Sequence, residues 1–94
     1  MTIKLSFEDQ VPLQLVLGSV GGQAMEDLQR STGVTLHVRG GEVTIDGDDA
    51  AASMVERLLR QMVGMARAGT PIHPGDLPRA LEVLRREPRI DLRS

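Results

Sequence analysis

The sequence predicts an α+β fold in which helices cover one face of a three-stranded sheet. Residues 2–7, 34–39 and 42–46 alternate apolar and polar side chains, which is the period of a half-buried strand. Residues 23–32 and 49–68 instead carry apolar side chains at helical spacing, and residues 11–17 form a dense apolar run that favours a short helix. The resulting order is strand, short helix, helix, hairpin and long helix, and 94 residues leave room for one such core.

The first strand and the first helix are short and are followed by a glycine-rich loop. Ile3, Leu5 and Phe7 share one face of the strand. Pro12 falls in the first turn of the helix over 11–17, where a missing N–H group costs little. Three glycines in five residues then predict a loop over 18–22, because a regular element would not need that backbone freedom.

The centre of the chain predicts a helix and an antiparallel hairpin. The helix over 23–32 ends at Gly33, a residue suited to the left-handed conformation that closes helices. The strand over 34–39 is expected to turn at Gly40-Gly41 into the strand over 42–46.

Two more helices complete the predicted fold. Asp48 and Asp49 supply an N-cap and an acidic first turn to a helix that runs to about residue 68 and stops at Gly69. After a turn-rich joint, Asp76 is expected to cap a last helix that has Pro78 in its first turn. The apolar stripe expected on the long helix is Ala51, Val55, Leu58, Leu59, Met62, Met65 and Ala66.

We expect residues 1–69 to form the domain and residues 70–94 to add a helix and a charged, Pro-broken linker.

Composition restricts the classes of function. Eleven basic and thirteen acidic residues give a net charge of −2, so any contact with nucleic acid has to be local. The absence of cysteine excludes disulfides and thiolate chemistry. The N-terminus lacks the apolar stretch of a signal peptide, and no run is long enough to span a membrane, so a cytoplasmic location is expected.

The stretch from Leu13 to Val63 resembles a KH domain. Gly21-Gly22 precede the second helix, STGVTLHV follows it, and VTIDGDDAAASMVERLL leads into the long helix, as in that family. The family carries a GxxG loop with a basic residue inside. Counting back from Thr32-Gly33 puts Ser19 at the first glycine, whereas the shifted Gly18-Ser19-Val20-Gly21 satisfies the letters and lacks the basic residue. The resemblance implies a KH-like three-stranded sheet with helices on one face, extended by a C-terminal helix.

Almost the whole chain is similar to the N-terminal domain of PhoH-like ATPases, a phosphate-starvation-inducible family. The similarity is carried by LQLVLG, LQRSTGVTL, VRGGEVTIDGD and AAASMVERLLRQMVGMARAG in this order, and PIHPGDLPRALEVLRRE resembles the helix that precedes the catalytic domain there. The phosphate-binding motif G-x-x-x-x-G-K-[ST] occurs nowhere in the sequence. The resemblance therefore implies an accessory domain and no enzyme. ATP and Mg²⁺ are implied only for an ATPase domain outside these residues, and no cofactor is expected within them.

The KH resemblance places the contact surface on the glycine loop and the hairpin tip. Glycine lets a sugar–phosphate chain approach closely, and the N–H groups that start the next helix donate to phosphate. The candidate nucleic-acid-binding residues are Gly18, Ser19, Val20, Gly21, Gly22, Gln23, Arg39 and Gly40. The alternative is that these glycines only close a tight turn between helices. Bases would rest on five aliphatic residues for which plain core is the favoured role, namely Val16, Leu17, Met25, Leu36 and Val38.

Other chemistry has little support in the sequence. His37 is expected on the polar face of a strand, and His73 is expected to help start the last helix; neither lies at metal-ligand spacing from other ligands. The serines lack a neighbouring histidine to act as a base. No catalytic or metal-binding residue is therefore predicted. Arg57, Arg60 and Arg67 are expected to form a solvated helix face, with a docking surface as the alternative.

Two functions stay open at this point. The first is binding of single-stranded RNA, or DNA, on behalf of a PhoH-type ATPase domain in the same chain. The second is a degenerate KH-like module for protein docking or oligomerisation without nucleic acid, which the net charge and the missing loop cation favour. An RNA-processing endoribonuclease and further copies of the full-length protein are candidate partners, and no membrane is expected. A positive groove would favour the first function, and a neutral or negative one the second.

Overall fold

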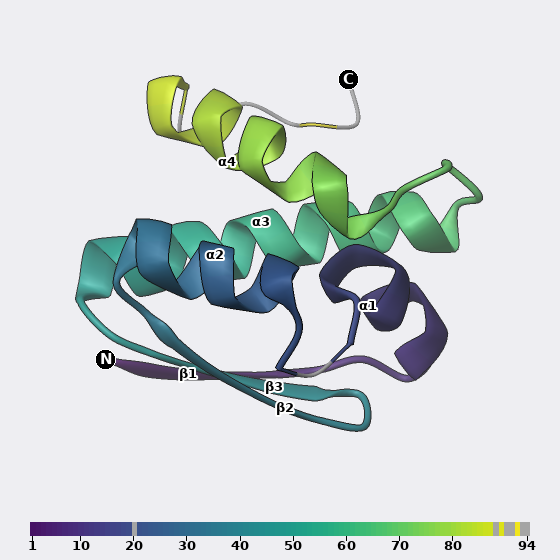
Figure 1. The fold of residues 1–94 in the computed structure, drawn as a ribbon, viewed down its shortest axis with the longest axis horizontal. Coiled ribbons are helices and arrows are strands. Elements are labelled where there is room, and N and C mark those ends of the chain that lie inside the picture. Colours follow the sequence, from purple (N-terminus) through teal and green to yellow (C-terminus); the bar gives the residue numbers. More distant parts are fainter. Residues whose placement is uncertain (20, 88, 90–91, 93–94) are drawn as a thin grey trace.

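The computed structural model describes residues 1–19, 21–87, 89 and 92, and its first layer is a three-stranded antiparallel sheet. The central strand is the last one in the chain, and the strands are β1 (Thr2–Ser6), β2 (Thr35–Arg39) and β3 (Glu42–Asp46) in the order β1-β3-β2. One face of this sheet is covered by three helices, namely α1 (Gln10–Leu17), α2 (Gln23–Thr32) and α3 (Asp49–Arg67). A 3₁₀ turn η1 (Pro74–Asp76) leads into α4 (Leu77–Arg86), which lies across α3 on the side away from the sheet (Figure 1).

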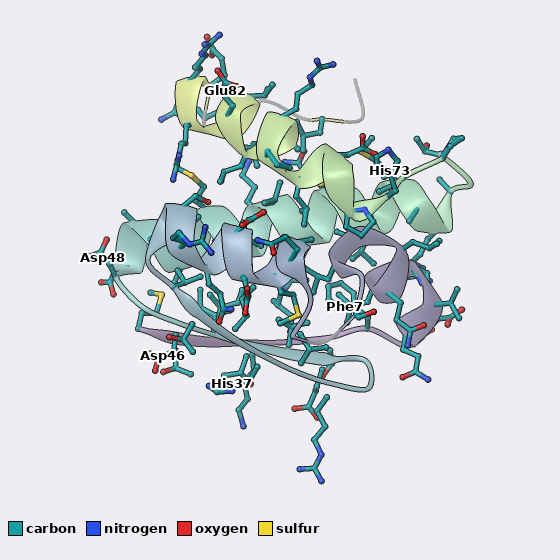
Figure 2. All side chains as sticks on the ribbon, in the orientation of Figure 1. Phe7, His37, Asp46, Asp48, His73 and Glu82 are labelled. Atoms are coloured by element: carbon teal, nitrogen blue, oxygen red, sulfur yellow. The ribbon has the colours of Figure 1, made fainter. Side chains whose placement is uncertain are left out.

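The strand register puts apolar rows toward the helices and polar rows toward the open face. Ile45 lies between Ile3 and Leu36, and Val43 lies between Leu5 and Val38. On the other face, Thr44 lies between Lys4 and His37. Figure 2 shows His37 pointing away from the helices, as the alternation predicted. Side chains alternate along a strand, so one apolar face is enough to hold the sheet on the helices.

The helix α3 is the centre of the core because it packs against the sheet and α1 on one side and against α4 on the other. Its buried residues are Ala52, Val55, Leu58, Leu59, Met62 and Val63. The predicted stripe was therefore wrong at its edges. Ala51, Met65 and Ala66 are only partly buried, while Ala52 and Val63 are fully buried. A helix covered by two layers buries a wider arc than a single stripe provides.

Several predicted boundaries are confirmed. The helix α2 spans the predicted residues, and Gly33 closes it with φ +80° in the left-handed region. The hairpin turns at Gly40-Gly41, and Pro78 lies in the first turn of α4. The first strand is one residue shorter than predicted, because Phe7 leaves the ladder.

The joint before α4 differs from the prediction. Asp76 precedes α4 but makes no capping hydrogen bond to it; its carboxylate accepts from the His73 backbone N–H at 3.1 Å. In turn, the His73 Nδ1 accepts from the Gly75 backbone N–H at 3.1 Å. The two side chains thus cap η1 reciprocally, so His73 does help to start this helical region, and Asp76 is committed to η1. Asp48 likewise lies at the N-cap of α3 without a capping hydrogen bond.

Residues on both sides of position 70 share one hydrophobic core. Leu77, Leu81 and Leu84 of α4 belong to the same buried cluster as the residues of α3 and the sheet. Beyond α4, the Leu92 backbone N–H donates to Gln61 Oε1 at 2.6 Å. The proposed division into residues 1–69 and 70–94 stays a prediction, and the two parts pack as one body.

The order of elements and of strands makes this an α+β, KH-like fold with an additional C-terminal helix, as predicted. In the part of the chain that the structure describes, no helix has the length and apolar character needed to span a membrane.

Candidate nucleic-acid interface

The glycine loop between α1 and α2 is a tight connection that requires glycine at its start. Gly18 caps α1 with φ +75° and ψ −153°, a conformation that is essentially restricted to glycine. Its N–H donates to the Gln14 carbonyl at 2.8 Å. A Cβ atom at Gly18 would also lie 3.0 Å from Pro74 Cγ. The loop therefore packs against η1. Gly18 is required by the fold itself, because it closes the tight turn between α1 and α2.

The hairpin tip is held in place by the residue that follows β1. The Phe7 N–H donates to the Gly41 carbonyl at 2.8 Å. A Cβ atom at Gly41 would lie 2.3 Å from the Phe7 carbonyl oxygen, so only glycine allows this approach. The tip thus has a defined position relative to the neighbouring start of α1.

Between the loop and the tip lies a groove of about 460 Å³, which we call the glycine-loop groove. Its walls come from α1, the loop, the start of α2, β2 and the hairpin tip, and its lining residues are Gln10, Leu13, Gln14, Leu17, Gly18, Ser19, Met25, Val38 and Gly40. None of these residues carries a charge. The groove offers aliphatic surface together with amide, hydroxyl and backbone groups.

The structure brings together three of the eight predicted binding residues. Gly18 and Ser19 line the groove on one side and Gly40 on the other. Gly21 and Gly22 belong to the same loop but do not line the groove, and Val20 lies outside the described residues.

The other two predicted residues, Gln23 and Arg39, lie elsewhere. Gln23 Nε2 donates to Asp27 Oδ1 at 2.8 Å on the side of α2 that faces α4. Arg39 follows the groove residue Val38 along β2, and the alternation of the strand assigns Arg39 to the open face with His37. The cation expected to serve the loop is thus absent from the lining of the groove.

The aliphatic candidates divide into two groups. Leu17 and Met25 are buried and Val38 is partly buried, and all three also line the groove. Val16 and Leu36 belong to the core alone. Leu13, Gln10 and Gln14 line the groove but were not predicted. The sequence signal for the glutamines is a pair of polar residues one turn apart in an otherwise apolar helix.

A second hollow of about 450 Å³, the α2–α4 cleft, was also not predicted. Its lining is mostly apolar and consists of Gln23, Ala24, Asp27, Leu28, Ser31, Pro74, Gly75, Leu77, Pro78 and Leu81. Near one end of the two helices, the Arg85 guanidinium donates to the Ser31 carbonyl oxygen. Figure 2 shows His73 on the segment that leads into α4.

The remaining candidates are the two histidines and the arginines of α3. Among the described residues, no group of three or more His, Asp or Glu side chains is arranged to hold a metal ion. Arg60 and Arg67 are exposed as expected, and Arg60 pairs with Glu56 on its own helix, whereas Arg57 is half-buried.

Comparison with known proteins relates this KH-like chain to PhoH-like proteins. It is 33% identical over 66 residues to the PhoH-like protein of Mycobacterium leprae. It is 32% identical over 66 residues to the PhoH-like proteins of Mycobacterium bovis and Mycobacterium tuberculosis. The match covers 68% of this chain but spans only 19% of the length of these relatives. No family model and no solved structure matches the chain.

Proposed function

We propose that the chain is an accessory domain that binds single-stranded nucleic acid, RNA in the first place, for a PhoH-like ATP-binding protein. One observation carries the proposal: Gly18 and Ser19 line the same groove as Gly40, in a fold of KH-like topology. KH domains use a GxxG loop to clamp the backbone of a single strand. The sequence Gly18-Ser19-Val20-Gly21 has these letters at the corresponding connection.

The backbone around the loop supports contact with phosphate. The helix α2 begins directly after Gly22, which has no side chain to cap it. The N–H groups at the start of a helix bind anions when no side chain satisfies them. The Gly22 N–H itself is occupied, since it donates to the Ser19 carbonyl at 2.9 Å.

The lining of the groove supports contact with bases through aliphatic surface. Val38 is partly buried and offers surface for this contact, whereas Leu17 and Met25 are 2% and 3% exposed and contribute little. The chain has no Trp or Tyr, and its one Phe, Phe7, does not line the groove. Without aromatic stacking and without a cation, binding should be weak and should depend only slightly on salt.

The test is a titration of the isotope-labelled chain with short single-stranded RNA and DNA, at low and moderate salt, observed through backbone amides by NMR. Shifts should gather at Gly18, Ser19 and Gly40. If no amide moves even at low salt, the proposal is wrong.

A matched pair of variants at Gly21 tests the site. Gly21 has φ +78° and no atom within 4 Å of the position of a Cβ. Asp and Asn are among the residues that adopt this backbone most readily, so both variants should fold. Gly21→Asp brings a negative charge beside the phosphate path and should weaken binding at least about tenfold. Gly21→Asn, which is neutral and of equal size, should bind much like the parent chain. Equal binding by both variants would overturn the site.

A second candidate function is docking to another part of a PhoH-like protein. The observation that favours it is the groove itself, which no charged side chain lines, in a chain of net charge −2. To test it, the labelled chain is mixed with the remaining four-fifths of a PhoH-like relative. Shifts in the glycine-loop groove in this experiment, together with none from RNA or DNA, would replace the first proposal by the second.

A further inference from the structure

The strand β1 has one long side that no other strand covers, which we call the β1 edge. Met1 exchanges backbone hydrogen bonds of 2.8 and 3.0 Å with Gly47, and the Phe7 N–H donates to Gly41. Backbone groups of an antiparallel strand turn alternately to its two sides, so the residues that turn away from β3 are Thr2, Lys4 and Ser6. Their N–H and C=O groups bond to no other described residue.

A hollow of about 340 Å³, the edge trough, lies between the end of β1 and α3. The helix runs along the strand in the same direction (Figure 1), because Asp49 at its start lies 3.6 Å from the Met1 amino group. At the other end of the helix, Arg67 lines the trough together with Ser6. The full lining is Ser6, Phe7, Glu8, Arg60, Val63, Gly64 and Arg67.

The β1 edge has basic side chains on both faces of the sheet. Arg60 and Arg67 line the trough on the helix side, and Lys4 lies on the open face. Lys4 and Arg67 form no hydrogen bond or ion pair with the described residues, whereas Arg60 pairs with Glu56 at 3.1 Å. Glu8 is the single acidic residue in the lining of the trough. The surroundings of the edge are therefore basic in a chain of net charge −2.

The edge trough continues into an exposed apolar patch on α1. Glu8 and Arg67 also line a neighbouring hollow, to which Val11 and Leu15 contribute. These two residues are one helical turn apart and are 55% and 46% exposed. Apart from Met1, no other large apolar side chain among the described residues is exposed. An apolar pair beside unpaired backbone groups is typical of a surface that contacts protein.

We infer that the β1 edge binds an extended, acidic segment of a partner protein as a fourth strand. Such a strand would pair its backbone with the outward N–H and C=O groups of β1. Its acidic side chains would meet Arg67 on one face and Lys4 on the other, and an apolar residue at its end would cover Val11 and Leu15. A second copy of β1 suits the edge less well, since antiparallel pairing about the central Lys4 would place two lysines opposite each other.

The test uses synthetic peptides of about nine residues, the length of a strand, at physiological salt, where distant charges are screened. One peptide alternates glutamate and threonine and ends in leucine, and a second has lysine in place of glutamate. In NMR spectra of the labelled chain, the glutamate peptide should shift the amides of Thr2, Lys4 and Ser6 and slow hydrogen exchange at Lys4 and Ser6. It should bind about fivefold more tightly than the lysine peptide.

Two further comparisons separate strand pairing from attraction between charges. A glutamate peptide methylated on its backbone nitrogens keeps its charge but cannot donate to β1, so its affinity should fall at least about tenfold. Arg67→Glu should weaken the glutamate peptide about fivefold and strengthen the lysine peptide, a reversal that unfolding cannot produce. The matched control is Arg79→Glu, the same charge change on the exposed side of α4, which should alter neither affinity.

Three results would overturn the inference. The first is a glutamate peptide that shifts no amide of β1, and the second is equal binding of the glutamate peptide and either the lysine or the methylated peptide. The third is a set of shifts at Thr2, Lys4 and Ser6 that grows with protein concentration in the absence of peptide, because a second copy would then occupy the edge. None of these results depends on nucleic acid, so the proposed function is tested separately.

Discussion

The two hollows of this molecule have nearly the same volume but different chemistry. The glycine-loop groove measures about 460 Å³ and the α2–α4 cleft about 450 Å³. The cleft is walled mainly by Leu, Pro and Ala side chains, and its one glutamine, Gln23, is bonded to Asp27. The walls of the groove carry a serine, two glycines and two glutamine amides that have no hydrogen-bond partner among the described residues. Directional hydrogen bonds fix the orientation of a ligand and select one ligand over another, whereas apolar surface alone does not. The groove is therefore the better candidate for specific recognition.

The connections that form the two hollows also differ. At the groove, the hairpin tip closely approaches the residue after β1, where backbone meets backbone. The cleft depends on leucine packing between α2 and α4. Substitutions should therefore damage one hollow without the other, and this can be measured.

The largest effect is expected for Leu81→Ala, which removes a wall of the α2–α4 cleft. Leu81 is 4% exposed and belongs to the core cluster. Truncating a buried leucine costs lost burial and leaves a cavity, so the free energy of unfolding should fall by about 3–4 kcal/mol in urea denaturation. The amides of Gly18, Ser19 and Gly40 should keep their chemical shifts.

The control for this variant is the same substitution at an exposed leucine. Leu15→Ala, at a residue that is 46% exposed on α1, should cost less than about 1 kcal/mol. Shifts throughout the glycine-loop groove in Leu81→Ala would show that the two hollows are not independent.

The next largest effect is expected for Gly41→Ala, which damages the groove and spares the cleft. The new Cβ would lie 2.3 Å from the Phe7 carbonyl oxygen, so the backbone of the hairpin tip has to move. We expect a loss of about 2–3 kcal/mol in the free energy of unfolding. Gly40→Asn is the matched control, because a Cβ there meets its nearest neighbour at 3.8 Å and Asn tolerates positive φ; it should lose about 1 kcal/mol. Equal losses in the two variants would contradict the close approach.

A smaller effect is expected for Gln29→Ala, which acts on the link between the two hollows. Gln29 Oε1 accepts from the Leu36 N–H at 2.8 Å and so ties α2, a wall of the cleft, to β2, a wall of the groove. Removing it leaves a partly buried N–H without a partner, which should cost about 1–2 kcal/mol. Hydrogen exchange at the Leu36 amide should become faster. Gln23→Ala, which breaks an exposed bond, should cost less than about 0.5 kcal/mol, and an equal loss there would contradict this prediction.

The sequence alone determined the local elements and their order. The helix over 23–32 and its end at Gly33, the turn at Gly40-Gly41 and the alternation of the strands depend on neighbours in the chain, so composition and period predict them. The KH-like fold and the relation to PhoH-like proteins could be predicted from the sequence for the same reason, since both are recognised from the order of motifs along the chain.

Only the tertiary structure decided which of these residues share a site. Gln10 and Gly40 are thirty positions apart, and they line one groove because the Phe7–Gly41 contact holds the hairpin tip beside the start of α1. The burial of Val63 could equally not be predicted, because it depends on how the sheet and the neighbouring helices pack around α3. Periodicity shows which residues share the apolar face of a helix or strand. Which other element packs against that face is decided by packing across the whole chain.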